Sequence, residues 1–288
     1  MGKTMLKLIP LVNGNYKLIQ WEPLGGVHGA DIECIHVTPN VWNIDKSSVG
    51  TVQIEYEPQV GCLRFSIDFP RISIRHNVGV AAYSEVIYGH KPWGPTTCMD
   101  PQFKFPIKVN ESKGLYSYVN YNVKSRSPDD SIFNIAYDLW LTTSPNLTNG
   151  PQPGDVEVMI WLYYHGQRPA GRLIGELRMP ITLGDSEAAR DFEVWVADTG
   201  IGIGEWAVVT FRIKDPIKGG LIGVNLINYI ESAFKTLEEL NPVKWRYGDL
   251  LNKYLNGIEF GSEFGNVSSG MIKLNWELCG LSLVKDSS

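Results

Sequence analysis

An acidic residue stands among aromatic ones in the segment 155–164, where aliphatic and reactive side chains alternate with a period of two. Such alternation predicts a β-strand with one face buried against a second sheet. The aliphatic face consists of Val156, Val158, Ile160 and Leu162. The opposite face carries Glu157, Met159, Trp161 and Tyr163. A carboxylate beside flat aromatic rings can act as an acid, base or nucleophile towards a ligand that stacks on those rings.

The segment 133–141 repeats this pattern and adds a second carboxylate. Its apolar face consists of Phe133, Ile135, Tyr137, Leu139 and Leu141, and its other face of Asn134, Ala136, Asp138 and Trp140. The loop between the two segments is long and polar, so we expect the strands to pair antiparallel with Asp138 near Glu157. The alternative interpretation is a solvent-exposed face with scattered charges.

A third strand with carboxylates is predicted near the C-terminus, over residues 257–265. Glu259 and Glu263 share one of its faces, and Gly261 between them leaves space over the backbone. Two carboxylates on opposite sides of a groove suit glycoside hydrolysis, in which one protonates the leaving oxygen while the other attacks or activates water. Trp and Met side chains would form the floor of such a groove and Asn side chains its rim.

The elements that must position these groups are nearly all strands. Period-two segments separated by Gly, Pro, Asn and Asp cover residues 51–56, 63–69, 103–109, 115–123, 133–141, 156–164, 192–196, 206–213, 258–264 and 271–284. They predict an all-β protein, a β-jelly-roll sandwich of two antiparallel sheets with a concave substrate cleft. Residues 221–240 instead have a period near 3.6, which predicts one external α-helix near 223–240 on the convex side, ended by Asn241 and Pro242. We expect residues 1–288 to form a single catalytic domain, although residues 1–30 match no pattern.

Composition narrows the function classes. The chain of 288 residues is 43% hydrophobic and 20% charged, and its net charge of −5 gives no electrostatic footprint for nucleic acid or an anionic membrane. It has no run of 18 apolar residues that could span a membrane. The histidines never fall at metal-ligand spacing and the GxGxG at 200–204 opens no helix, so no metal and no cofactor are expected. The four cysteines, Cys34, Cys62, Cys98 and Cys279, are compatible with zero, one or two disulfides.

Five strings, in order along the chain, resemble motifs of glycoside hydrolase family 12, the jelly-roll endoglucanases. Glu-Val-Met-Ile-Trp-Leu at 157–162 is similar to the family's nucleophile strand, and Asn-Ile-Ala-Tyr-Asp-Leu at 134–139 to the strand whose Asp contacts the nucleophile. Phe-Gly-Ser-Glu at 260–263 resembles the string that carries the acid/base. Asn-Val-Trp at 40–42 is similar to an outer sugar subsite, and Arg-Pro-Ala-Gly at 168–171 to a loop over the cleft. The stretch 83–94 resembles archaeal members more than fungal ones.

The resemblance implies an endo-acting retaining hydrolase, an endo-β-1,4-glucanase or cellulase that cleaves cellulose and related β-glucans through a covalent glycosyl-enzyme. Glu157 would be the nucleophile and Glu263 the acid/base, while Asp138 would share a hydrogen bond with Glu157. Glu259 is the rival of Glu263, but it lacks the preceding Gly-Ser. The expected substrate-binding residues are Asn40, Trp42, Trp93, Asn134, Met159, Trp161 and Pro169.

Two other functions fit the same residues: a non-catalytic carbohydrate-binding jelly roll, and a hydrolase of the same fold specific for xyloglucan or xylan. The pair of Glu157 and Glu263 argues against the first, because a lectin has no reason to place two repelling carboxylates across a groove. The expected partner is a β-glucan polysaccharide, with no nucleic acid and no membrane, and the protein is expected to be monomeric. Because a polymeric glucan cannot enter a cell, we also expect a secreted protein whose signal peptide is absent from this chain.

Overall fold

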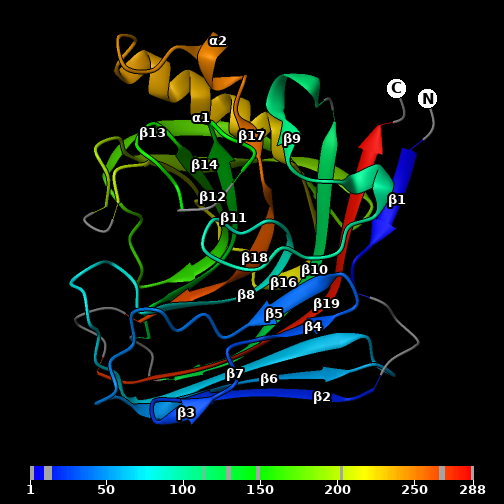
Figure 1. Ribbon diagram of the computed structural model, residues 1–288, viewed down its shortest axis with the longest axis vertical. Coiled ribbons are helices and arrows are strands. Elements are labelled where there is room, and N and C mark those ends of the chain that lie inside the picture. Colours follow the sequence, from blue (N-terminus) through cyan, green and yellow to red (C-terminus); the bar gives the residue numbers. More distant parts are fainter. Residues whose placement is uncertain are drawn as a thin grey trace.

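The computed structural model describes residues 3–9, 15–112, 114–127, 131–146, 150–201, 204–265 and 270–286, and most of its regular structure is β-strand (Figure 1). The strands are β1 (Lys3–Lys7), β2 (Lys17–Glu22), β3 (Gly25–Gly26), β4 (Ala30–Ile32), β5 (Ile35–Thr38), β6 (Val49–Glu57), β7 (Cys62–Arg71), β8 (Ala82–Gly89), β9 (Ile107–Lys108), β10 (Leu115–Ser127), β11 (Phe133–Thr142), β12 (Val156–His165), β13 (Arg172–Leu183), β14 (Ser186–Ala197), β15 (Ala207–Ile213), β16 (Gly219–Asn225), β17 (Tyr254–Leu255), β18 (Gly257–Phe264) and β19 (Ile272–Asp286). The α-helices are α1 (Leu226–Leu240) and α2 (Tyr247–Leu250).

Hydrogen bonding arranges most of these strands in two runs. The first, which we call the cleft sheet, has the order β4-β5-β8-β18-β11-β12-β15-β14-β13. The second, the back sheet, has the order β3-β2-β6-β7-β19-β10-β16. The predicted jelly-roll sandwich is confirmed, with two differences. The neighbours β12 and β15 are parallel, and β13 pairs with β16, which joins the two sheets at one edge.

Aromatic side chains fill the space between the two sheets. In the cleft sheet, the rings of Tyr137 and Phe260 lie 4.8 Å apart. Phe260 also contacts Tyr121 and Trp276 of the back sheet, at 5.7 and 6.2 Å between ring centroids. Trp276 stacks on Phe65 of β7 at 4.0 Å. Side chains of the other parity in the cleft sheet, such as Glu157 and Met159, point away from this core.

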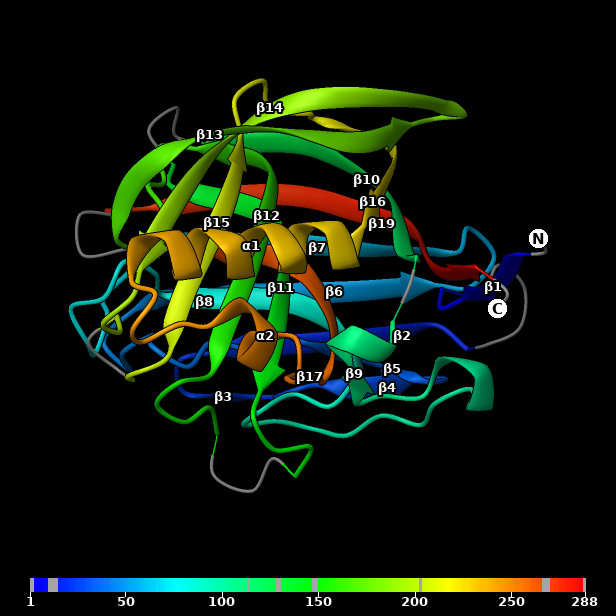
Figure 2. The ribbon, with the colours of Figure 1, turned by 90° about the horizontal axis from the view of Figure 1, so that it is seen from above.

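The helix begins five residues later than the start of its periodic segment, because residues 219–225 form strand β16. The side chain of Asn225 accepts hydrogen bonds from two backbone N–H groups of the first helical turn, which fixes this start. Tyr229 of α1 packs edge-on against Phe192 of β14 and Phe211 of β15, at 5.5 and 5.3 Å. Helix α1 therefore covers the convex side of the cleft sheet, as the pattern predicted, and Figure 2 shows it lying across β15, β12 and β11.

The strand pattern differs from the expectation in several places, and strands β2, β5 and β13 are absent from the prediction. The strand predicted over 103–109 is wrong: 3-10 turns at Pro101–Phe103 and Val109–Glu111 flank the two-residue β9. Pro101 and Pro106 lack the N–H that a strand ladder requires, and Asp100 caps the first turn by accepting from the Gln102 backbone. The period-two pattern did not predict strand β8, because every one of its residues is buried and polar and apolar residues therefore do not alternate.

Both disulfides that the sequence left open are formed. Cys34 pairs with Cys98, and Cys62 pairs with Cys279. The first ties the turn between β4 and β5 to the loop of residues 90–99, which follows β8. The second ties the start of β7 to the middle of β19.

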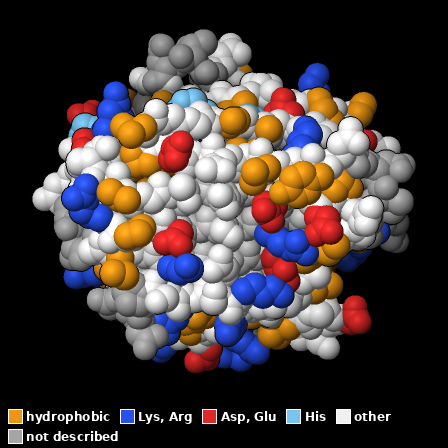
Figure 3. All heavy atoms as spheres, turned by 90° about the horizontal axis from the view of Figure 1, so that it is seen from below, with side chains coloured by type: hydrophobic (Ala, Val, Ile, Leu, Met, Phe, Trp, Pro, Cys, Tyr) orange, Lys and Arg blue, Asp and Glu red, His pale blue; other side chains and the backbone are white. Residues whose placement is uncertain are grey.

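The outer face of the back sheet carries ion pairs, such as Arg64 with Glu57 at 2.8 Å and Lys273 with Asp68 at 2.9 Å. Figure 3 shows acidic and basic side chains interspersed on the side of β2, β6 and β7, without a patch of one sign. Among the described residues, no helix is both long enough and apolar enough to cross a membrane.

Candidate active site

A cleft of about 570 Å³ lies over the cleft sheet, on the side that faces away from the core. It includes Glu157 and Glu263 together with Trp42, Met159, Trp161 and Pro169. Strand pairing explains why carboxyl groups from different strands lie close together. In β11 and β12, Asp138 stands opposite Met159 and Trp140 opposite Glu157, so Asp138 and Glu157 are diagonal neighbours on one face. On the other side of β11, Asp138 stands opposite Glu259 of β18.

Glu157 is buried, with 7% of its surface exposed. The indole N–H of Trp206 donates a hydrogen bond of 2.7 Å to its Oε2 atom. Burial raises the pKa of Glu157 to about 8; the Trp206 bond opposes this shift, and the negative charges of Glu263 and Glu259 add to it. A donor from an aromatic ring thus favours the ionised form of a carboxyl group that its surroundings otherwise hold neutral.

Glu263 is held from β11 and from the loop after β12. The side-chain amide of Asn134 donates to its Oε2 atom, and its backbone N–H donates to Asn134 Oδ1 at 3.0 Å. Gln167 donates to the same Oε2 atom at 3.2 Å. Burial raises the pKa of Glu263 to about 7, against these amide bonds, which lower it. Burial thus makes both Glu157 and Glu263 hold their protons to a higher pH than free glutamates do.

The contacts of Asp138 differ from the expected hydrogen bond to Glu157. No hydrogen bond joins it to Glu157 within the described residues, and its Oδ1 atom is buried without a partner there. The two groups are coupled by charge instead. Burial raises the pKa of Asp138 well above its usual value, and the charges of Glu157 and Glu259 raise it further. The structure thus places Asp138 beside the nucleophile candidate as a carboxyl group that tends to keep its proton.

Glu259, the rival of Glu263, points into a different environment. It forms an ion pair with Lys91, whose Nζ atom also lies 3.1 Å from Glu85. Glu259 is 2% exposed and is not among the residues that line the cleft. Gly261 explains how β18 approaches β8: a Cβ atom there would lie 2.2 Å from the backbone oxygen of Ser84. The space that this glycine leaves is therefore taken by the neighbouring strand and not by a ligand.

The other predicted binding residues divide between the cleft and its surroundings. Trp42, Met159, Trp161 and Pro169 line the cleft. The loop 168–171 reaches over it as the resemblance implied, because Gly171 (φ +80°) lets the loop turn against β14, where a Cβ atom would come within 2.0 Å of a backbone oxygen. Asn134 acts through Glu263. Asn40 is not a lining residue, and its side-chain amide donates to Glu85 at 2.6 Å.

Trp93 belongs to an aromatic cluster beside Glu157. Its ring packs edge-on against Trp140 and Trp206, at 4.9 and 5.3 Å, and it is 54% exposed. The loop between β11 and β12 covers its other side, since a Cβ atom at Gly150 would lie 2.3 Å from the Trp93 indole nitrogen. Sequence reasoning missed Trp206, because it lies at a strand start 49 residues from Glu157 and no local pattern connects the two.

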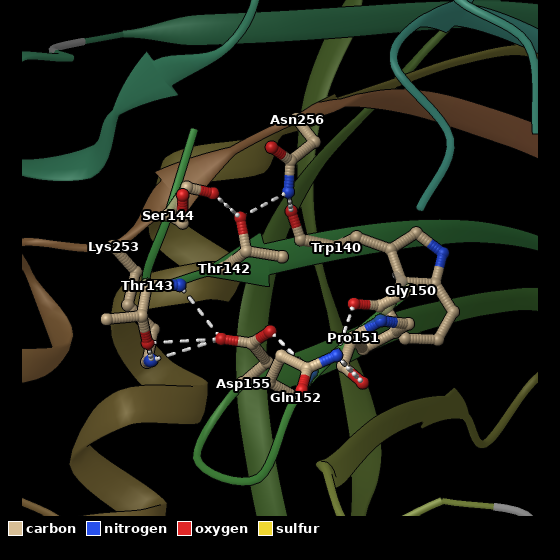
Figure 4. A network of polar contacts seen from close by, with 10 residues as sticks. All are labelled: Trp140, Thr142, Thr143, Ser144, Gly150, Pro151, Gln152, Asp155, Lys253 and Asn256. Atoms are coloured by element: carbon tan, nitrogen blue, oxygen red, sulfur yellow. Dashed lines mark hydrogen bonds and ion pairs between the residues drawn. The ribbon is translucent and has the colours of Figure 1, made fainter. Parts of the chain in front are cut away.

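A network of polar contacts joins the two ends of the loop between β11 and β12 (Figure 4). The carboxylate of Asp155 accepts hydrogen bonds from the backbone N–H groups of Thr143 and Gln152, both at 2.8 Å. Lys253 lies 3.8 Å from the same carboxylate and donates to the Thr143 hydroxyl at 2.9 Å. Asn256 donates to the backbone oxygen of Trp140 at 3.1 Å. The network therefore holds the ends of β11 and β12, and with them Glu157, in place.

Comparisons with known proteins point the same way. The model of glycosyl hydrolase family 12 matches residues 34–278. Among solved structures, a family 12 xyloglucanase from Bacillus licheniformis in complex with ligand is 18% identical, with 94% of this chain and 100% of that chain covered and a TM-score of 0.65. Endoglucanase Cel12A from Rhodothermus marinus is 21% identical, with 96% and 98% covered and a TM-score of 0.55. A metagenome-derived family 12 endoglucanase is 22% identical, with 93% and 99% covered and a TM-score of 0.59. A search of curated proteins found no match.

At these identities the solved structures establish the fold alone, and the family model establishes membership. A jelly roll with a pair of carboxyl groups in a cleft lined by tryptophan has the architecture of a glycoside hydrolase. The chain belongs to glycosyl hydrolase family 12 and is a glycoside hydrolase.

Proposed function

We propose that the protein is an endo-acting, retaining hydrolase of β-1,4-glucosidic bonds in cellulose and related β-glucans. The observation that carries the proposal is the pair of Glu157 and Glu263, which come from β12 and β18 and line one cleft. One carboxyl group can attack the anomeric carbon while the other protonates the leaving oxygen. The family resemblance gives Glu157 the role of nucleophile and Glu263 that of acid/base.

The hydrogen bonds around the pair leave one oxygen of each carboxyl group available. Trp206 bonds only the Oε2 atom of Glu157, and both amides bond only the Oε2 atom of Glu263, so within the described residues each carboxyl group keeps Oε1 for the substrate. Glu157 would attack from its ionised form and bond to the sugar, while the proton of Glu263 passes to the departing glucan. Glu263 would then take a proton from the water that releases the sugar, which restores both groups.

The cleft also supports endo action on a long chain. Its lining extends across the sheet from Trp42, just after β5, to Ala197, at the end of β14. A polymer bound across several strands can be cut away from its ends. Trp42 and Trp161 offer flat surfaces for sugar rings, and Met159 lies between the two catalytic candidates on the floor.

One assay distinguishes the proposed function from two alternative functions. Reducing-sugar release should be measured side by side on carboxymethylcellulose, mixed-linkage β-glucan, xyloglucan and xylan. We expect the first two to be cleaved fastest. A strong preference for xyloglucan or xylan would make that polysaccharide the assigned substrate. This alternative is supported by the xyloglucanase among the similar structures. Binding without release from any of the four would instead favour a carbohydrate-binding module.

The mechanism has its own test. In a retaining enzyme the two carboxyl groups stand about 5–5.5 Å apart, compared with about 6.5–9.5 Å in an inverting one. Proton NMR of the first product should therefore show the β-anomer before mutarotation. Glu157→Gln should abolish turnover on every substrate, whereas Glu187→Gln, an exposed residue of β14, should not. Initial release of the α-anomer would refute the retaining mechanism.

We also infer that the protein is secreted and that residues 1–288 form one catalytic domain. Two disulfides within the described chain support the first point, because such bonds persist in oxidising compartments and are reduced in the cytosol. The continuous core between the two sheets supports the second. Activity in the culture medium of the producing cells would test secretion.

A further inference from the structure

A lysine lies buried next to the catalytic pair, in a place where hydrolysis by two carboxyl groups requires no cation. Lys91 belongs to the loop 90–99, whose turn is closed by hydrogen bonds from Gly94 N–H to the Lys91 oxygen and from Lys91 N–H to the Pro95 oxygen, both 3.1 Å. The disulfide between Cys98 and Cys34 anchors the end of this loop. The loop therefore holds Lys91 in a fixed position.

The side chain of Lys91 bridges two glutamates from neighbouring strands. Its Nζ atom contacts Glu259 of β18 and lies 3.1 Å from Glu85 of β8. The exposed fractions are 10% for Lys91, 0% for Glu85 and 2% for Glu259. Burial disfavours the charged form of Lys91, but the two glutamates outweigh it and raise the pKa of the lysine. Asn40 supports the arrangement by donating to Glu85.

This triad adjoins the catalytic pair. The groups that interact electrostatically with Lys91 or its two partners come from four strands: Tyr83 and Glu85 of β8, Asp138 of β11, Glu157 of β12, and Glu259 of β18. Four of these are carboxyl groups, and Asp138 and Glu157 in turn interact with Glu263. The positive charge of Lys91 lowers the pKa of Glu85, Asp138 and Glu157, in opposition to burial, which raises all three.

We propose that Lys91 is a positioning residue of the reaction, a buried counter-charge that balances Glu85 and Glu259 and so allows Glu157 to ionise as the nucleophile. The inference rests on the proposed function and adds a part to it. Without the ammonium group, uncompensated negative charge would lie near the catalytic pair, and Glu157 would hold its proton to a higher pH. Lys91 does not line the cleft, so it acts through the other groups and not by touching substrate.

The test is the pH dependence of kcat/KM on mixed-linkage β-glucan. Lys91→Met should move the acidic limb of the plot of kcat/KM against pH to higher pH by about one unit, as expected for loss of one nearby buried charge. Glu85→Gln removes a negative charge and should move the same limb downward. The double variant Lys91→Met/Glu85→Gln should return near the wild-type limb. Lys273→Met is the control, because it removes the same charge from an ion pair with Asp68 on the outer face of the back sheet, away from the cleft.

The pattern of shifts decides the outcome. Opposite shifts that cancel in the double variant support the counter-charge role. A fall in kcat with an unmoved acidic limb would overturn it, since a merely structural role loses rate without moving the limb. An equal upward shift in Lys273→Met would also overturn it, because any loss of positive charge would then suffice. If Lys91→Met does not fold, the downward shift of Glu85→Gln decides alone, and its absence would overturn the proposal.

A second readout separates this proposal from the proposed function. If the wild-type protein releases no sugar from any β-glucan, the proposed function fails, but the charge balance can still be measured by thermal unfolding between pH 5 and 8. Buried carboxyl groups with raised pKa values lose stability as pH rises through this range. Lys91→Met should make the loss of Tm steeper and Glu85→Gln should make it shallower. Equal slopes in all three proteins would overturn the role of Lys91.

Discussion

The substitution Glu157→Gln should make the protein more stable, and only at high pH. In the folded protein, burial raises the pKa of Glu157 from 4.5 to about 8. Between these values the folded state binds more protons than the unfolded state, so wild-type stability falls as pH rises through this window. Glutamine has a similar shape and carries no charge at any pH, so the variant does not suffer this loss.

The magnitude follows from the width of the window. A shift from 4.5 to about 8 is 3.5 units, which at about 1.4 kcal/mol per unit gives a ceiling of about 5 kcal/mol at pH 8.5. At pH 4 the carboxyl group is protonated in both states, and the difference should be within about 0.5 kcal/mol. Since about 1 kcal/mol moves Tm by about 2–4 °C in large domains, this ceiling corresponds to a Tm at most about 10–20 °C higher for the variant at pH 8.5.

Differential scanning calorimetry of both proteins at pH 4, 6 and 8.5 measures this effect. Glu187→Gln, on the exposed part of β14, is the control and should leave Tm unchanged at all three values. An equal gain in Tm at pH 4 and pH 8.5 would refute the reasoning, because it would show better packing and not relief of a buried charge. No gain at pH 8.5 would show that the surroundings of Glu157 do not hold it neutral in the folded protein.

Four further outcomes are expected. Glu263→Ala should retain activity on aryl glycosides with good leaving groups and regain turnover with azide, measured by release of the aryl group, because such groups depart without protonation. Trp206→Phe removes a hydrogen bond to a carboxylate worth about 1.5–3 kcal/mol, so kcat/KM at pH 5 should fall about 10–100-fold and its acidic limb should move upward. Cys34→Ala/Cys98→Ala opens a crosslink with a sequence separation of 64, which should lower the unfolding free energy by about 4 kcal/mol in urea titrations. Calorimetry should show one unfolding transition, and size-exclusion chromatography one monomer peak, for a single-domain protein.

The sequence was informative where a local period decides the structure. Alternation assigned most residues of β11 and β12 to their faces correctly, since Val158 and Tyr137 are fully buried in the core while Glu157 lines the cleft. Tyr163 was assigned wrongly to the face of Glu157: a β-bulge shifts the register, and Tyr163 stands opposite Ile135 and packs against Phe133 of the core. The same period required that Asp138 and Glu157 share a face once the two strands paired. The pattern failed where turn chemistry overrode it, around Pro106, and where glycines at 219–223 let a strand run into the helix.

The rest depends on contacts between distant segments. Lys91 and Glu259 are separated by 168 residues, and nothing in either neighbourhood indicates that they form an ion pair. The fully buried β8 offers no alternation, so its Glu85 could not be assigned to a face. Trp206 likewise gains its role only when β15 pairs with β12. Which strands become neighbours is set by how the sheets pack, and a single sequence read by period does not contain that information.

The strand order also determines when the site can exist during synthesis. β11 and β12 form a hairpin that can close soon after it leaves the ribosome, with Asp138 and Glu157 already on one face. Glu263 follows Asn134, its hydrogen-bond partner, by 129 residues, which at about 5–20 residues per second corresponds to a delay on the order of ten seconds. β19, at the centre of the back sheet, is the last strand of all. A chain interrupted before β18 would carry the proposed nucleophile without the proposed proton donor, so hydrolysis that depends on this pair would require nearly complete translation.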